Sequence, residues 1–204
     1  MLNNGIDISK HNGNAEEYIK YADFVLIRVG YGKNHIDEKF YQNVQLCEKY
    51  KKDWGAYWFS YATNIEEAAF EAIYMLDAIR KCSYKPSLPV FIDWECDSET
   101  NLNKHGIKFT WPLYNSFVTM FCKICEICGY YAGIYCDKNH FNHLNTKAFC
   151  CWVAWWNGVS KIDINDFTVI IKQYKVDKTK NLDINVLKDE NLINIIKTKH
   201  FNGW

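Results

Sequence analysis

Apolar and polar residues alternate in blocks along the chain, and eight of the apolar runs are about as long as a β-strand. Most are rich in β-branched or aromatic residues, which is typical of strands that pack into a sheet. The predicted strands are Gly5–Ser9, Phe24–Val29, Trp54–Tyr61, Leu88–Ile92, Tyr131–Cys136, Cys151–Trp155, Thr168–Tyr174 and Asp183–Val186.

Longer segments between these strands carry apolar residues three or four positions apart, the spacing of an amphipathic helix. The predicted helices are a short one at Ala15–Tyr21, one at Asp37–Lys52, one that starts at Asn64 and has a buried stripe through Ile79, and one at Phe109–Cys128. Asp97–Lys108 is polar, and we expect it to be a loop that overhangs the functional site.

This alternation of strands and helices predicts an α/β fold with a parallel sheet. The Gly-rich turn Gly30–Asn34 lacks both the dinucleotide-binding and the phosphate-loop patterns. A closed (β/α) barrel is therefore favoured over an open, doubly wound sheet. A chain of 204 residues is short for a TIM barrel, which usually has ~200–400 residues. We expect an irregular, TIM-barrel-like fold with reduced helices.

The composition is that of an ordinary globular protein, with 49% hydrophobic and 24% charged residues, enough for the core of one domain. Lys+Arg and Asp+Glu both number 24, so no global field favours nucleic acid or anionic lipid. No apolar stretch approaches the ~20 residues of a membrane helix. We expect a monomer with no nucleic-acid partner and no membrane partner.

Aromatic residues make up 17% of the chain, including 8 Trp and 14 Tyr, and this abundance makes a sugar a candidate ligand. Flat amphipathic rings can bind the faces of sugars. Packing of aromatic residues inside a barrel explains any single ring equally well.

The nine Cys residues are odd in number and do not form an evenly spaced disulfide framework. The first nine residues, MLNNGIDIS, lack the basic and apolar regions of a signal peptide, so synthesis in a reducing cytoplasm is expected. Cys122, Cys125 and Cys128 lack the continuation of an iron–sulfur motif. His140 and His143 lack a Glu at zincin spacing. We expect no metal and no cofactor.

Four carboxylates carry the candidate chemistry. Asp93 and Glu95 follow the central strand, and because side chains alternate along a strand, residues two apart project to the same face. Asp7 and Asp183 also lie at or just past the apolar parts of strands. In a β/α barrel such positions converge on one mouth, where mutual repulsion raises the pKa of at least one acid. A protonated Glu beside ionised Asp residues is the arrangement that glycoside hydrolysis requires. The alternatives are acids that merely mark the exit from the sheet and a divalent-metal site.

Several motifs occur together and in one order along the chain: GIDISKHNG, FVLIRVGYG with a following D-x-x-F at Asp37–Phe40, GAYWFSYA, PVFIDWE, GIYCDKNHF, WVAWW, IKQY and LDINV. In these motifs and in their order, the chain resembles the glycoside hydrolase family 25 lysozymes. This group includes Chalaropsis-type muramidases and many phage endolysins. The resemblance covers about Gly5–Val186.

The resemblance implies that Glu95 is the general acid/base and Asp93 the second catalytic carboxylate, with Asp7 and Asp183 as two further active-site acids. The implied reaction is hydrolysis of the β-1,4 bond between N-acetylmuramic acid and N-acetylglucosamine in peptidoglycan, with retention. Whether Asp93 attacks the sugar or assists the substrate's own 2-acetamido group stays open.

Candidate sugar contacts are residues in or beside the matching motifs: Tyr61, Tyr135, Trp156, Gln173 and Tyr174. Trp152 is expected to belong to the core. Arg28, within an apolar strand, is expected to form a structural ion pair, although a substrate contact is the alternative.

Two other functions fit parts of the pattern. A chitinase or N-acetylglucosaminidase of family 18 also ends its catalytic strand in D-W-E, but its fuller pattern has an Asp where this chain has Phe91. A carbohydrate-binding barrel without catalysis is the alternative from a different class, and retention of all four acids argues against it.

The resemblance also divides the chain, into a catalytic barrel at residues 1–187 and a tail, or the start of a linker to a wall-binding module, at 188–204. Because a signal peptide is not recognised, we expect a phage endolysin made in the host cytoplasm that acts on the cell wall after release.

Overall fold

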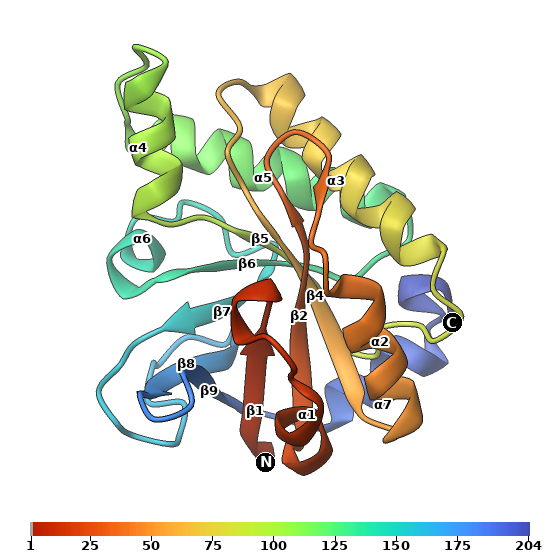
Figure 1. The fold of residues 1–204 in the computed structure, drawn as a ribbon. Helices are drawn as coiled ribbons and strands as arrows, with labels where there is room; N and C mark the ends of the chain where they lie inside the picture. The colour runs from red at the N-terminus through yellow and green to blue at the C-terminus, as the bar shows by residue number, and fades with distance from the viewer. Residues whose placement is uncertain (1) are drawn as a thin grey trace.

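The computed structural model describes residues 2–204, so Met1, at which the predicted catalytic domain begins, lies outside the described residues. The centre of the fold is a closed barrel of eight strands, and β1 pairs with β2 to complete the ring (Figure 1). The barrel strands are β1 (Leu2–Ile8), β2 (Phe24–Tyr31), β4 (Asp53–Phe59), β5 (Val90–Asp93), β6 (Ala132–Asp137), β7 (Cys150–Ala154), β8 (Val169–Asp177) and β9 (Leu182–Leu187). A short strand, β3 (His35–Ile36), extends β2 as a hairpin. The α/β barrel and all eight predicted strands are confirmed.

The prediction of a parallel sheet is wrong for the last strand. Within the barrel, the pairs from β1 through β8 are parallel, but β9 is antiparallel to both of its neighbours. The reason is the connection from β8, a tight turn in which Asn181 has a φ of 49°. So short a turn can only reverse the chain, because a parallel partner needs a long crossover. As a result, the start of β9 lies at the barrel end where the other strands finish.

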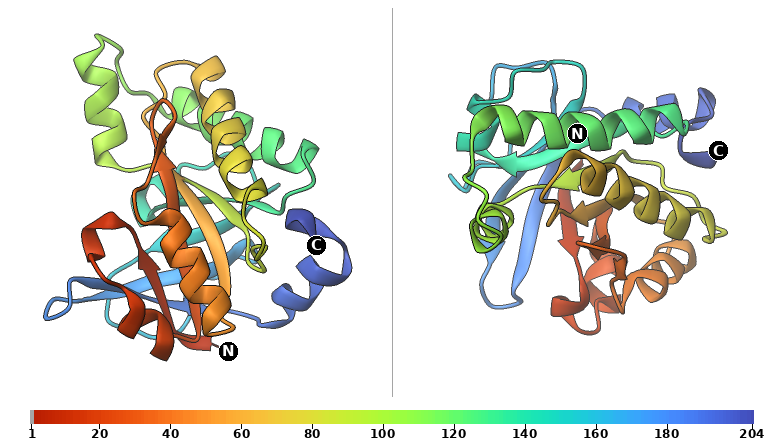
Figure 2. Two further views of the ribbon diagram at one scale, coloured as in Figure 1. Left: turned by 45° about the vertical axis from the view of Figure 1, so that its right-hand side comes forward. Right: turned by 90° about the horizontal axis from the view of Figure 1, so that it is seen from above.

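Helices cover the barrel unevenly. They are α1 (Glu16–Tyr21), α2 (Phe40–Lys49), α3 (Ile65–Arg80), α4 (Cys96–Lys104), α5 (Trp111–Ile127), α6 (Lys138–Asn142) and α7 (Asn191–Thr198), with 3-10 turns η1 (Lys10–Asn12) and η2 (Phe201–Gly203). The four predicted helices correspond to α1, α2, α3 and α5. Figure 2 shows α3 and α5 side by side against the barrel. A loop replaces the helix between β7 and β8, as expected for so short a chain.

The predicted loop Asp97–Lys108 is instead largely helical, as α4. Its polar sequence, rich in Asn, Asp, Ser and Thr, is a weak helix former. Tertiary contacts overcome this weakness: Leu102 is fully buried, and the Ser98 hydroxyl donates to the Ser60 carbonyl at 2.7 Å. The helix stands beside the barrel mouth (Figure 1).

Residues 188–204 close the barrel end opposite the mouth. Leu192, Ile193 and Ile196 of α7 are buried in the same cluster as Phe24 and Leu26 of β2. This packing explains why a stretch that is polar overall lies against the barrel near the start of β1 (Figure 1).

Asn202 locks this closing segment to the barrel. Its side chain is fully buried, accepts from the Tyr131 amide at 2.9 Å, and donates to the carbonyls of Leu88 at 2.9 Å and Pro86 at 3.3 Å. Its φ of 59° lies in the left-handed region, which Asn tolerates better than most residues.

We expect Asn202→Ala to lower the free energy of unfolding by about 2–4 kcal/mol, because it leaves the Tyr131 amide and the Leu88 carbonyl without their partner and places Ala in a left-handed conformation. Urea denaturation measures the change, and Asn194→Ala on the exposed face of α7 is the matched control. Equal stability of the two variants would contradict the assigned role.

Candidate active site

The four predicted acids come together at the barrel mouth. Asp7 lies near the end of β1, Asp93 ends β5, and Asp183 lies near the start of β9, where it is the register partner of Asp7. Together with Glu95 they line one cavity of about 370 Å³. The other residues that line the cavity are Arg28, Tyr57, Phe59, Tyr135, Trp152, Trp156, Gln173, Val176 and Asn181.

Strand alternation carries Asp93 and Glu95 to the same cavity, as the sequence predicts. Glu95 follows the strand and keeps an extended backbone, with φ −136° and ψ −179°, as the residue preceding α4. Trp94 between them is fully buried on the opposite side, with its ring centroid 5.6 Å from that of Phe117 and 5.9 Å from that of Tyr114. The outward-facing Trp thus holds the two carboxyls in the mouth.

Asp93 is the most enclosed of the acids. Its side chain is buried, and its Oδ1 has no hydrogen-bond partner within residues 2–204. Burial raises the pKa of Asp93 well above its usual range, and the neighbouring charges of Glu95 and Asp7 add to the shift. Folding therefore favours the protonated form of this carboxyl.

Glu95 lies nearer the cavity opening and is partly buried. Burial raises its pKa, the Tyr135 hydroxyl opposes the shift, and the charge of Asp183 adds to it. A carboxyl with a raised pKa at an accessible position is suited to general-acid catalysis.

Asp7 is held by two side-chain amides. Its Oδ2 accepts from Gln173 Nε2 at 2.9 Å and from Asn185 Nδ2 at 2.8 Å. Burial, reinforced by the charge of Asp183, nevertheless raises the pKa of Asp7 to about 7. Burial also raises the pKa of Asp183.

The two amides are in turn oriented by ring donors. Gln173 Oε1 accepts from Trp156 Nε1 at 2.8 Å and from the Tyr135 hydroxyl at 3.1 Å, while Asn185 Oδ1 accepts from Trp152 Nε1 at 2.8 Å. Because an indole N–H can only donate, each amide must turn its NH₂ group toward Asp7. The network therefore fixes one carboxylate oxygen in position.

Asn185 was not among the predicted site residues, and Trp152 was predicted to belong to the core. Trp152 is indeed buried, but it also lines the cavity. The signal for Asn185 was present, because it lies two residues after Asp183 on a strand and so shares its face.

Arg28 forms the expected structural ion pair. Its Nη2 lies 2.7 Å and its Nε 2.8 Å from Oδ2 of the buried Asp37. Arg28 also lines the cavity, where its charge opposes the rise in the pKa of Asp93.

Two predicted sugar contacts lie elsewhere. Tyr174 is buried in the layer between the barrel and its covering segments and does not line the acid cavity. Since Gln173 points inward, strand alternation sends its neighbour outward. Tyr61 lines a second hollow beside the acid cavity. Tyr135, Trp156 and Gln173 are at the cavity, and Trp156 is 64% exposed.

The loop that carries Trp156 is organised by a buried cation. Lys172 is fully buried, and its Nζ donates to Asp163 Oδ1 at 2.6 Å, Asn157 Oδ1 at 2.9 Å and the Val159 carbonyl at 3.1 Å. These bonds give a segment without regular structure a fixed path beside the mouth.

Within residues 2–204, no group of three or more His, Cys, Asp or Glu side chains is arranged to hold a metal ion. Cys122 and Cys125 are buried on α5, whereas Cys128 is exposed at its end. Among the helices of the described chain, none has the length and apolar character needed to cross a membrane.

Comparison with solved structures shows the same fold in cell-wall enzymes. The modular autolysin LytC of Streptococcus pneumoniae matches with a TM-score of 0.75 and 19% identity, over 90% of this chain and 46% of LytC, so the chain spans about half the length of that protein. The catalytic domain of endolysin ply40, from bacteriophage P40 of Listeria monocytogenes, matches with a TM-score of 0.73 and 21% identity, over 97% of this chain and 98% of the other. A lysozyme of Streptomyces coelicolor matches with a TM-score of 0.74 and 19% identity, with the same coverage.

A comparison with curated protein sequences gave no match. The family model "Glycosyl hydrolases family 25" matches residues 6–181, which is most of the chain and includes three of the four clustered acids, Asp7, Asp93 and Glu95. The chain belongs to glycosyl hydrolases family 25.

Proposed function

We propose that the chain is an N-acetylmuramidase that hydrolyses β-1,4 bonds between N-acetylmuramic acid and N-acetylglucosamine in peptidoglycan, with retention. The observation that carries the proposal is the placement of Glu95, with its raised pKa, beside three other carboxyls in one cavity. Membership of the family supports it, as does a LytC structure described as a complex with a synthetic peptidoglycan ligand.

In the proposed reaction, protonated Glu95 donates its proton to the oxygen of the scissile bond as that bond breaks. Positive charge then develops on the sugar ring, and the carboxylates of Asp7 and Asp183 stabilise it electrostatically. Glu95, now ionised, removes a proton from the water that completes hydrolysis. The same carboxyl thus serves as acid and then as base.

We further propose that Asp93 orients the substrate's 2-acetamido group, whose oxygen attacks the anomeric carbon as the glycosidic bond breaks. The water activated by Glu95 then attacks the same carbon and breaks the bond to the acetamido oxygen, which gives net retention. The partnerless, buried Oδ1 of Asp93 supports this role because it is free to accept from the acetamido N–H. Rescue of Asp93→Asn by azide, with formation of an inverted glycosyl azide, would contradict this route and favour direct attack.

Analysis of new chain ends tests the proposed function. Purified Gram-positive walls are treated with the enzyme, loss of turbidity is followed, and the reducing ends are identified. Ends at N-acetylmuramic acid are expected. Ends at N-acetylglucosamine would establish a glucosaminidase instead, and sugar binding without any cleavage would favour a non-catalytic barrel.

The pH profile gives an independent prediction. On the alkaline side, kcat/KM falls as Glu95 loses its proton. Asp183→Asn removes a negative charge that raises the Glu95 pKa, so the alkaline limb is expected to move to lower pH by about 0.5–1 unit. Kinetics on solubilised glycan measure it, with Asp77→Asn on the surface of α3 as the control. A limb that stays in place or moves to higher pH would refute the coupling.

We also propose that the enzyme acts as a phage endolysin, made in the host cytoplasm and active on the cell wall after release. The match to the endolysin ply40 catalytic domain supports this setting. Lysis of Gram-positive cells that requires co-expression of a holin would agree with it, and lysis without a holin would not.

A further inference from the structure

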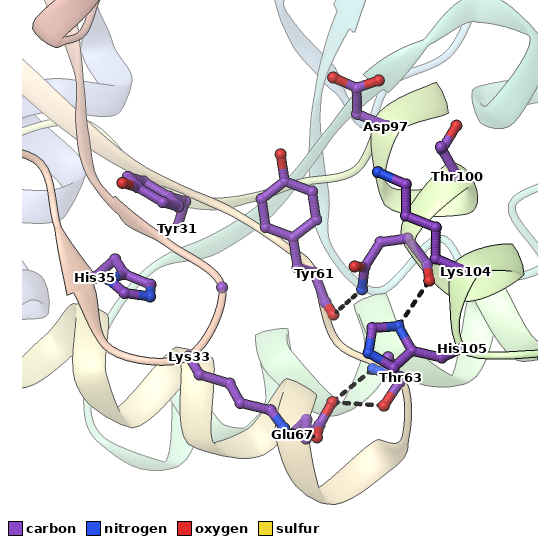
Figure 3. A pocket seen from close by; sticks show the side chains of 12 residues that line it. Tyr31, Lys33, His35, Tyr61, Thr63, Glu67, Asp97, Thr100, Lys104 and His105 are labelled. Carbon is purple, nitrogen blue, oxygen red and sulfur yellow. Dashed lines mark hydrogen bonds and ion pairs between the residues drawn. The ribbon is translucent and has the colours of Figure 1, made fainter.

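A second hollow lies beside the acid cavity and is larger, at about 500 Å³. Three segments line it: the β2–β3 hairpin, the connection from β4 into α3, and α4. The lining residues are Tyr31, Gly32, Lys33, His35, Tyr61, Thr63, Glu67, Asp97, Thr100, Asn101, Lys104 and His105. Figure 3 shows Tyr61 standing between the hairpin with Tyr31 and the helix with Thr100 and Lys104.

The two hollows adjoin each other. Phe59 lines the acid cavity and Tyr61 lines the second hollow, and the centroids of their rings are 5.0 Å apart. Glu95 lines the acid cavity, and α4 starts at the next residue and forms one wall of the second hollow. A polymer that leaves the acid cavity on this side would pass over Tyr61.

The walls of the hollow are fixed by buried contacts. The Tyr61 amide donates to Glu71 Oε1 at 2.9 Å, and the Tyr61 carbonyl accepts from Asn101 Nδ2 at 2.8 Å. Glu71 is itself buried and accepts from the Ser60 hydroxyl at 2.6 Å. The peptide groups on both sides of Tyr61 are therefore held before any ligand arrives.

Gly32 lets the hairpin approach Tyr61 closely. It has a φ of +52°, and a Cβ at this position would lie 3.1 Å from the Tyr61 ring. The Gly32 amide also donates to the Phe59 carbonyl at 3.0 Å. The shape of the hollow therefore depends on a residue without a side chain.

The chemistry of the lining is polar, aromatic and electrically balanced. Lys33 pairs with Glu67 at 2.7 Å, and the other Lys and Asp of the lining, Lys104 and Asp97, carry opposite charges. A balanced lining gives no net attraction for phosphates or nucleotides. Two tyrosine rings with hydroxyl, amide and ammonium donors around them suit an uncharged, N-acetylated sugar ring.

We propose that this hollow binds a neutral sugar of the same glycan strand, at a distance from the scissile bond. The inference rests on the proposed function and extends it: the enzyme would prefer long strands because they also reach the second hollow. Binding energy gained there holds the strand in register with Glu95.

The test compares a tetrasaccharide with long strands, both prepared from peptidoglycan without stem peptides. We expect Tyr61→Ala to lower the ratio of kcat/KM for long strands to kcat/KM for the tetrasaccharide about tenfold. Tyr61→Phe, which keeps the ring, should preserve the ratio. Tyr21→Ala changes an exposed tyrosine on α1 and is the control. Titration of the long strand into Glu95→Gln protein, with and without Tyr61→Ala, measures binding without turnover.

The outcomes separate this inference from the proposed function. If the wild type cleaves both substrates and Tyr61→Ala keeps the ratio, the sugar site is refuted while the muramidase stands. If the ratio falls only for strands that carry stem peptides, the hollow binds peptide and the sugar assignment is wrong. If the wild type cleaves neither substrate, the proposed function fails, and the titration alone decides whether Tyr61 binds the strand.

Discussion

Glu95→Gln is expected to lower the rate of wall hydrolysis by about 10³-fold or more while leaving the protein folded. The substitution preserves shape but removes the proton that must reach the leaving oxygen, and general acid–base catalysis contributes roughly 10²–10⁴-fold. Because burial raises the pKa of Glu95, the folded protein favours its uncharged form, and a neutral amide should not lower stability. Turbidity loss and reducing-end release measure activity, and urea denaturation measures stability.

The matched control for Glu95→Gln is Asp77→Asn, a carboxyl-to-amide change on the surface of α3 with 54% of the side chain exposed. It should keep wild-type activity. If Glu95→Gln retained more than about a tenth of the wild-type rate, another group would have to supply the proton, and Asp183 or Asp7 would be the next candidate.

Strand periodicity made most of the barrel and the acid cluster predictable. A period of two places Asp93 and Glu95 on one face, and the fully buried Trp94 between them confirms that reading. Asp183 was predicted to join the other acids because the carboxyl ends of parallel strands converge on one mouth. It lies at the start of β9, and it joins the other acids only because the β8–β9 turn reverses the chain.

What the sequence did not reveal depends on tertiary contacts. The α4 segment has weak helix propensity and is held by Leu102 and Ser98. The sequence motif IKQY places Gln173 and Tyr174 side by side, but only one of two adjacent strand residues can face the cavity. The orientation of the Gln173 amide depends on Trp156, which is distant along the chain, so no local pattern could indicate it.

Clustering four acids in one cavity costs stability, and the cost depends on pH. Each of these carboxyls has a raised pKa, so each binds its proton more tightly in the folded than in the unfolded protein. Stability from such groups is fully present below their unfolded pKa values and is lost as pH rises through the folded values. The enzyme is therefore expected to be less stable in alkaline than in mildly acidic solution on account of its own active site.

Asp7→Asn should remove part of this cost and be more stable than the wild type at alkaline pH. The pKa of Asp7 rises from 3.8 to about 7 on folding, so the wild type loses stability from this group between about pH 4 and pH 7. Asn has no such loss and can still accept from Gln173 and Asn185. The advantage of the variant should grow across this interval to about 2–4 kcal/mol at pH 8. Urea denaturation at pH 4.5, 6 and 8 measures it, and hydrolysis should fall at every pH.

Asp166→Asn is the control of opposite sign. Lys147 and Thr168 bind Asp166, and although burial opposes them, its pKa is lowered to about 2. Its stabilising effect is present above its unfolded pKa and is lost as pH falls through the folded value. Asp166→Asn should therefore be less stable than the wild type at pH 8, where Asp7→Asn is more stable. If both variants shifted stability in the same direction at pH 8, loss of a negative charge in general, and not the enclosure of Asp7, would explain the result.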